Sequence, residues 1–284
     1  MTIENHAGSK TSDALSQLLR DPHQSNRHDI WLWLDLYLNE GAKLNPNTCN
    51  RPTMRDEIAK CLKQHANRIL RIPSKKDRLL LSDERLGWIE EGNERQHKWL
   101  LARIEQLTGI RIPRELVHLE GKDHLVAMID LWDIELETKA REVNSLREEW
   151  LRHVARDSAF EWFSDKKESK KRCTCAWEWL EKHHLRPHSR QLPISNYNEL
   201  LMFFDHAALG RHEQKAMIQE IKKRWNRQQF DERNADKKQI NVMLSKAVIA
   251  QLDELAKQHG LKRAQVIETL VRMEAETSAH LAST

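Results

Sequence analysis

The sequence predicts a mainly α-helical protein with one short β-strand near its C-terminus, paired with the same strand of a second copy. Apolar residues recur at three- and four-residue spacing through most of the 284 residues. The chain has only eight Gly and seven Pro, too few for sandwiches or barrels, which consume turn residues. In residues 239–244 apolar and polar side chains instead alternate, as in a half-buried strand.

The length leaves room for roughly two domains. We divide the chain into five segments. Residues 1–27 are polar and predict a flexible arm, apart from a possible short helix at residues 14–20. Residues 28–155 predict an N-terminal α-helical domain. Residues 156–236 predict a basic helical bundle that links this domain to a smaller C-terminal domain, residues 237–275. Residues 276–284 predict a flexible tail.

Helix patterns follow one another through the N-terminal domain. Asp29 and Thr53 are placed to cap two helices, and Gly109 is placed to end a third. Residues 122–154 contain no Gly or Pro. They predict either one long helix or two helices broken near Asn144. No motif in this domain indicates a chemistry.

Two parts of the basic bundle concentrate positive charge. Residues 164–190 carry eight Lys/Arg against four Asp/Glu, interleaved with Trp177 and Trp179, and residues 211–238 carry nine against five. Each segment therefore has a local charge of +4, equal to that of the whole chain. Such patches favour nucleic acid, although a charged helix face exposed to solvent is the ordinary alternative. The side chains predicted to contact a DNA backbone here are Lys215, Gln219, Lys222, Lys223 and Arg227.

The C-terminal domain is predicted to contain the strand, a helix capped by Ser245, a turn at Gly260 and a second helix. One strand and two helices in fewer than 40 residues are too little to close a core, so we expect a homodimer. The predicted dimer core comprises Ile240, Val242, Leu244, Ile249, Leu252, Ile267 and Leu270.

The turn after the first C-terminal helix, Gly-Leu-Lys-Arg-Ala-Gln-Val-Ile from Gly260, is similar to the G-x-S-R-S-E-x-I pattern of the ribbon-helix-helix (MetJ/Arc-type) DNA-binding family. Gly260, Arg263 and Ile267 match this pattern. Lys262 and Ala264 replace hydroxyl residues, which weakens the cap of the second helix.

The resemblance implies a dimer whose two-stranded β-ribbon enters the major groove of double-stranded DNA. Base readout is then expected from Gln239, Asn241 and Met243. Contacts with the DNA backbone are expected from Lys237, Lys238, Lys262 and Arg263. The alternative is a protein-interaction dimer of the antitoxin type, in which these side chains form a solvated face.

A second resemblance covers residues 160–275. Trp177-Glu178-Trp179, then Met217-Ile218 within a basic helix, then Lys237-Lys238 before the strand are similar to the order in the macrodomain Ter organising proteins. It implies a DNA-bound dimer, associating further on DNA, that organises a region of a chromosome or plasmid. That family lacks the first 155 residues. The alternatives are a transcriptional repressor or autoregulator, and an adaptor whose N-terminal domain binds an unknown protein partner.

Other functions have weak sequence support. Cys173-x-Cys175 with His183, His184 and His188 fits zinc-site spacing poorly, so buried Cys and exposed His are expected instead of a metal site. No nucleophile–base pattern or phosphate loop indicates an enzyme or a cofactor. Four Cys and the absence of an apolar run of about 18–20 residues favour a cytoplasmic protein without membrane segments. The expected DNA binding would place it at the nucleoid.

Overall fold

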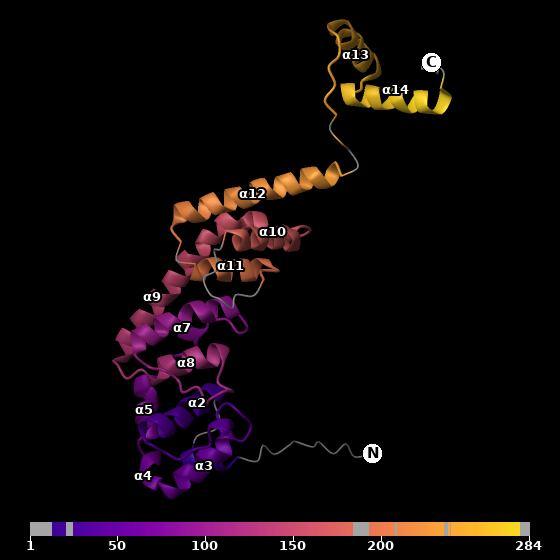
Figure 1. Ribbon diagram of the computed structural model, residues 1–284. Coiled ribbons are helices and arrows are strands. Elements are labelled where there is room, and N and C mark those ends of the chain that lie inside the picture. The colour runs from indigo at the N-terminus through magenta and orange to yellow at the C-terminus, as the bar shows by residue number, and fades with distance from the viewer. Residues whose placement is uncertain are drawn as a thin grey trace, which may run out of the picture. The chain divides into compact units, whose positions relative to one another are not determined.

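The computed structural model describes residues 13–20, 25–183, 193–207, 209–235, 238 and 240–278 (Figure 1). The described chain is mainly helical, which confirms the α-helical part of the predicted fold class. It divides into two compact units, Met1–Trp225 and Asn226–Thr284, called here the first unit and the C-terminal unit. The boundary between the units falls inside one helix, α12.

The first unit contains short helices followed by longer ones. Its α-helices are α1 (Ala14–Leu19), α2 (Asn26–Leu34), α3 (Met54–Gln64), α4 (Ala66–Ile69), α5 (Ile72–Leu79), α6 (Asp83–Leu86), α7 (Glu94–Thr108), α8 (Gly121–Leu131), α9 (Leu136–Val154), α10 (Ser169–Lys182), α11 (Tyr197–His206) and α12 (Arg211–Arg233). A π-helical turn, η1 (Asp35–Asn39), continues α2, and 3-10 helices occur at η2 (Pro46–Thr48) and η3 (Ala155–Ser164).

Three hydrophobic cores hold the first unit together. The first surrounds Trp31 and Trp33 of α2, with α3 packed against it. The second lies between α7, α8 and α9, and α7 runs beside α8 (Figure 1). The third joins η3, α10, α11 and α12 around Phe163 and Trp225. Six of the ten Trp are buried in these cores, where each supplies a large apolar side chain.

Asp29 does not cap a helix as predicted. α2 begins at Asn26, and Asp29 is buried within it, where its Oδ1 accepts a 2.6 Å hydrogen bond from Arg55 of α3. Arg55 also bonds to Asp13, which caps α1. α1 falls within the segment assigned to a flexible arm, and its Leu15 is 1% exposed.

The long stretch at residues 122–154 is broken, but not near Asn144. Trp132 and Glu135 leave the helical region, with ψ of 108° and 134°, so that α8 and α9 are separate helices. Asn144 lies inside α9 and donates to Glu148 four residues ahead. The turn allows α8 to pack against α2 and α7 while α9 contacts α6 and η3, so tertiary packing places the break where no Gly or Pro marks it.

The C-terminal unit comprises the end of α12, an extended segment, α13 (Lys246–His259) and α14 (Arg263–Thr277). No β-strand occurs among the described residues, and the predicted β-ribbon is therefore wrong. The alternation at residues 240–244 predicts only which side chains share a face. A strand also needs a neighbouring extended segment to bond its backbone, and the described chain offers none.

Candidate nucleic-acid interface

The two basic segments of the sequence meet at one tryptophan. Trp162 of η3 has the Arg172 guanidinium of α10 at 4.6 Å from its ring centre and the Lys222 ammonium of α12 at 5.5 Å. Arg172 is fixed further, because it donates to the Trp162 carbonyl at 2.6 Å and pairs with Glu168. These cation–π contacts hold charged groups from two elements on one surface. We call it the Trp162 surface, comprising Trp162, Arg172 and Lys222.

The part of α12 in the first unit divides its circumference into three sectors. At 3.6 residues per turn, its buried sector contains Ile218, Ile221 and Trp225. A second sector contains the carboxylates of this part, Glu213 and Glu220. The third, about one-third of the circumference, is basic or polar without a carboxylate. Its members are Arg211, His212, Lys215, Gln219, Lys222 and Lys223.

The α12 residues predicted to contact DNA differ in their exposure to solvent. Lys215, Gln219, Lys223 and Arg227 are exposed, whereas Lys222 is half-buried against Trp162. Lys223 reaches Glu220 at 2.7 Å, a pair so exposed that water screens it strongly. Four exposed lysines lie close in sequence to Arg172: Lys166 and Lys167 precede α10, and Lys170 and Lys171 are in its first turn.

The helix signals of the C-terminal unit are confirmed. Ser245 caps α13 by accepting a bond from the Val248 N–H at 3.4 Å. Gly260 ends α13 in the left-handed region, at φ 63°, which a residue with a Cβ seldom adopts. At the start of α14 the Lys262 side chain makes no cap, but its N–H donates to Gln265 at 2.9 Å, which is half of a capping box.

Arg263, expected on a DNA backbone, forms a two-pronged ion pair with Asp253 of α13, one bond being 2.7 Å. The pair is exposed and ties the start of α14 to α13. This pairing lowers the pKa of the Asp253 carboxyl. Lys262 is exposed beside it, so Lys262 is the stronger candidate for a phosphate contact at this turn.

The predicted base-reading face is only partly described. Gln239 and Lys237 lie outside the described residues, whereas Lys238 and Asn241 are exposed and Met243 is fully exposed. The predicted dimer core is presented to solvent at most of its positions. Exposed fractions are 77% for Ile240, 67% for Val242, 42% for Leu244, 44% for Ile267 and 50% for Leu270, whereas Ile249 is half-buried and Leu252 is buried.

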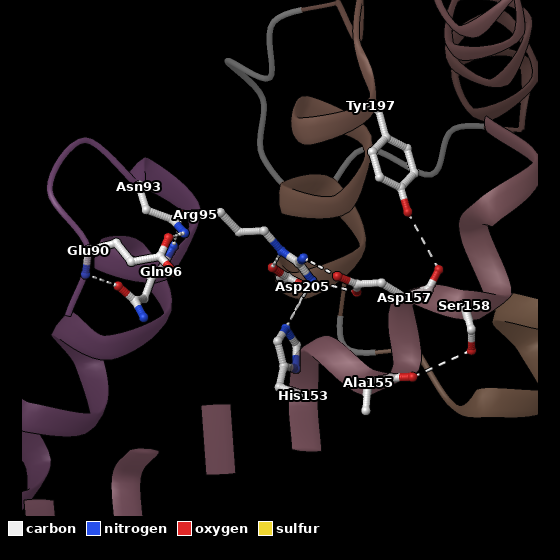
Figure 2. A network of polar contacts seen from close by, with 10 residues as sticks. All are labelled: Glu90, Asn93, Arg95, Gln96, His153, Ala155, Asp157, Ser158, Tyr197 and Asp205. Carbon is white, nitrogen blue, oxygen red and sulfur yellow. Dashed lines mark hydrogen bonds and ion pairs between the residues drawn. The ribbon is translucent and has the colours of Figure 1, made fainter. Parts of the chain in front are cut away.

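A polar cluster that the sequence analysis missed lies within the first unit (Figure 2). Arg95 of α7, 6% exposed, bonds to Asp157 of η3 at 2.5 Å and to Asp205 of α11 at 2.7 Å. His153 of α9 lies 2.8 Å from Asp205. Burial raises the pKa of the Asp205 carboxyl, but bonds from His153 and Arg95 outweigh it and hold that pKa below its usual value.

The Arg95 cluster is structural, because it joins the second core to the third and has little access to solvent. Up to 110 residues separate its members, so no local spacing reveals it. One signal was available: Arg95 precedes Trp99 by four residues, which places an arginine on the apolar stripe of α7. A charge at such a position needs a buried partner.

Cys173 and Cys175 are buried, as expected for the alternative to zinc, and burial raises the pKa of the Cys173 thiol to about 11. His183 is exposed, and His184 and His188 lie outside the described residues. In the described part of the chain no three His, Cys, Asp or Glu side chains gather as metal ligands. Nor is any described helix long and apolar enough to cross a membrane.

Comparison with known proteins gives no relative for this chain. No family model, curated protein or solved structure matches it.

Proposed function

We propose that the protein binds double-stranded DNA sequence-specifically as a homodimer, and thereby organises a region of a chromosome or plasmid. The observation that carries the proposal is the carboxylate-free sector of α12, held beside Arg172 of α10 at Trp162. A surface with an excess of positive charge attracts a polyanion through the release of the polyanion's counterions. The whole chain carries only +4, so this attraction is local.

The homodimer is supported by the exposure of apolar side chains in the C-terminal unit. Among its described residues, Leu252 and Val266 are the buried apolar ones. Ile240, Val242 and Val271 are each more than 60% exposed. A second copy offers the same apolar residues, and burying each such side chain contributes about 1.5–3 kcal/mol. Self-association would therefore supply the core that one copy lacks.

Within the dimer we assign base contacts to Gln239, Asn241 and Met243, and backbone contacts to Lys238 and Lys262. Asn side chains bond two adjacent edge atoms of adenine, and Met is suited to the apolar thymine methyl group. The support is the alternation along the extended segment. If Ile240 and Val242 face the second copy, then Asn241 and Met243 point away from it.

The proposed role in organising a replicon rests on the resemblance of residues 160–275 to the macrodomain Ter organising proteins. A genome-wide occupancy map separates the outcomes. Many sites clustered in one region support organisation, whereas one or two promoter sites indicate repression. Deletion of residues 1–155 provides a second experiment. Loss of the cellular effect with DNA affinity retained indicates an adaptor, whose N-terminal domain supplies the effect.

The direct test of the interface is the salt dependence of binding to a mixed-sequence duplex. Lys215→Gln with Lys223→Gln removes two exposed cations from α12 and spares the Lys222–Trp162 contact. We expect the slope of log K against log salt to fall by about 1.8, since each phosphate contact contributes about 0.9.

The matched control for this pair is Lys98→Gln with Arg141→Gln, which removes the same charge from exposed positions of α7 and α9. Its slope should equal that of the wild type. Equal slopes for all three proteins would remove α12 from the interface. Failure of the wild type to bind duplex DNA at low salt would contradict the proposed function.

A further inference from the structure

A third basic segment lies in the N-terminal part of the first unit, where the DNA proposal assigns no contacts. Residues 55–78 carry eight Lys/Arg against three Asp/Glu, a local charge of +5. Some of these cations hold the fold together. Arg55 pairs with Asp13 and Asp29, Lys75 with a buried aspartate of η1, and Arg78 with an aspartate after α8. Arg68 of α4 makes a looser contact, with its Nε 3.7 Å from the Glu40 carboxylate.

These cations surround a hollow of about 390 Å³ between the loop at residues 41–44, α3 and α4. Its charged lining comprises Lys43, Lys60 and Arg68 against one carboxylate, Glu57, and His65 also lines it. Glu57 accepts a bond from the backbone N–H of Asn45. The volume lies within the range of small-molecule sites, roughly 300–1,000 Å³, whereas a duplex backbone is contacted by an open surface.

The Arg68 guanidinium has hydrogen-bond donors that its contacts with Glu40 do not use. Its Nη2 donates to the Glu40 carbonyl at 3.2 Å, and its Nε lies 3.7 Å from the Glu40 carboxylate. Its Nη1 is screened from solvent and has no hydrogen-bond partner among the residues that the structure describes. Buried donors are nearly always bonded. A rotation of the guanidinium into the hollow would allow a planar or tetrahedral oxyanion to accept two parallel bonds from it.

We propose that this hollow binds a small molecule through an oxyanion group, a phosphate or a carboxylate. Arg68 supplies the paired donors, and Lys43 and Lys60 supply the surrounding charge. The half-buried Cys61 and the buried Leu44 line the same hollow, so the rest of the ligand contacts apolar as well as polar groups. The site is independent of DNA binding and gives the N-terminal part of the chain a ligand of its own.

Cys61 provides a probe inside the site. It is partly exposed, whereas Cys49, Cys173 and Cys175 are buried, so native alkylation should modify Cys61 first. The Cys61 thiolate displaces iodide from iodoacetamide and forms a thioether, which mass spectrometry counts. The rate is measured on the full chain with increasing inorganic phosphate, or with increasing succinate, against sodium chloride of equal ionic strength.

We expect saturable protection of Cys61, with at least a fivefold lower rate, by one or both probes. Protection by phosphate alone or by succinate alone identifies the preferred group. Protection should disappear in Arg68→Gln and weaken in Lys60→Gln. Lys63→Gln is the matched control, because Lys63 lies on the same helix but does not line the hollow. Far-UV circular dichroism checks that each variant is folded.

Two results would overturn the site. One is a rate that neither phosphate nor succinate lowers beyond the chloride control in the wild type. The other is equal protection of the wild type, Arg68→Gln and Lys60→Gln, which would mean that the probes act away from the hollow. Neither measurement includes DNA. The oxyanion site can therefore be disproved while the proposed DNA binding stands, and DNA binding can be disproved while the oxyanion site stands.

Discussion

The first unit and the C-terminal unit treat their apolar and charged side chains in opposite ways. In the first unit Trp33 and Phe163 are fully buried, and the buried Arg95 is paired with two carboxylates. In the C-terminal unit Ile240 is 77% exposed and Met243 is fully exposed, and the Arg263–Asp253 pair lies at the surface.

The difference indicates where each unit obtains its stability. The first unit closes three cores within one chain, so its free energy of unfolding should not depend on protein concentration. The C-terminal unit is too small and too exposed to fold securely alone, so it should gain stability from a second copy by mass action. The two units also have different proposed roles. The first unit attracts the DNA backbone by its positive charge, and the C-terminal unit contacts the bases.

The largest effect should come from Ile240→Asp. If two copies of Ile240 become buried in the dimer, the charge removes about 3–6 kcal/mol from its free energy of association, at about 1.5–3 kcal/mol per side chain. Sedimentation equilibrium without DNA measures this change. Asn241→Asp is the control, because it places the same charge on the neighbouring residue. An unchanged free energy of association in Ile240→Asp would contradict the claim that the C-terminal unit gains its core from a second copy.

Arg95→Met tests the other side of the comparison. It leaves the partly buried carboxylates of Asp157 and Asp205 without their buried cation, which should cost about 3 kcal/mol. Urea unfolding followed by tryptophan fluorescence measures the loss. Arg78→Met, which removes an exposed pair with Asp133, should cost no more than about 1 kcal/mol. A similar loss in the free energy of unfolding for both variants would show that the Arg95 cluster stabilises the first unit no more than an exposed ion pair does.

Asn241→Ala sharpens the proposed division of work. It should cost about 1–3 kcal/mol on a selected DNA site and leave binding to mixed-sequence duplex at low salt nearly unchanged, since α12 supplies that affinity. Fluorescence anisotropy on the two duplexes measures both values. Uniform weakening on both duplexes would contradict base readout by Asn241.

The smallest effect concerns Asp13, whose pKa is lowered from 3.8 to about 2, mainly by the hydrogen bond from Arg55. The folded state favours the charged carboxylate, so this pair stabilises the protein above pH 4, and its contribution disappears as the pH falls towards 2. Because Asp13 is exposed, Asp13→Asn should cost less than about 1 kcal/mol at pH 7. The wild-type and Asp13→Asn unfolding curves should converge near pH 2, and a constant difference would exclude this cause.

The sequence predicted local features well. Ser245, Gly260 and the basic helix that became α12 depend on interactions within a few residues, which spacing and residue type reveal. The candidate surface was predicted in part. Both basic segments were visible in the composition, but their meeting at Trp162 depends on packing between η3, α10 and α12.

Features set by distant residues were missed or wrong. The Arg95 cluster connects residues 110 positions apart, and the turn at Trp132 follows from the packing of α8 rather than from a breaker residue. The predicted strand failed for a related reason. Alternation describes the side chains of residues 240–244, whereas strand formation depends on a neighbour that the described chain does not contain.

The central claim, that this chain reads a DNA sequence as a homodimer, is tested most directly by sequencing the duplex fragments that the purified full-length protein retains from a random pool. We predict one enriched motif that is palindromic or occurs as a tandem repeat, since two copies of the same surface contact it. Retained fragments with no motif, or no retention above a control protein of equal charge, would contradict the account.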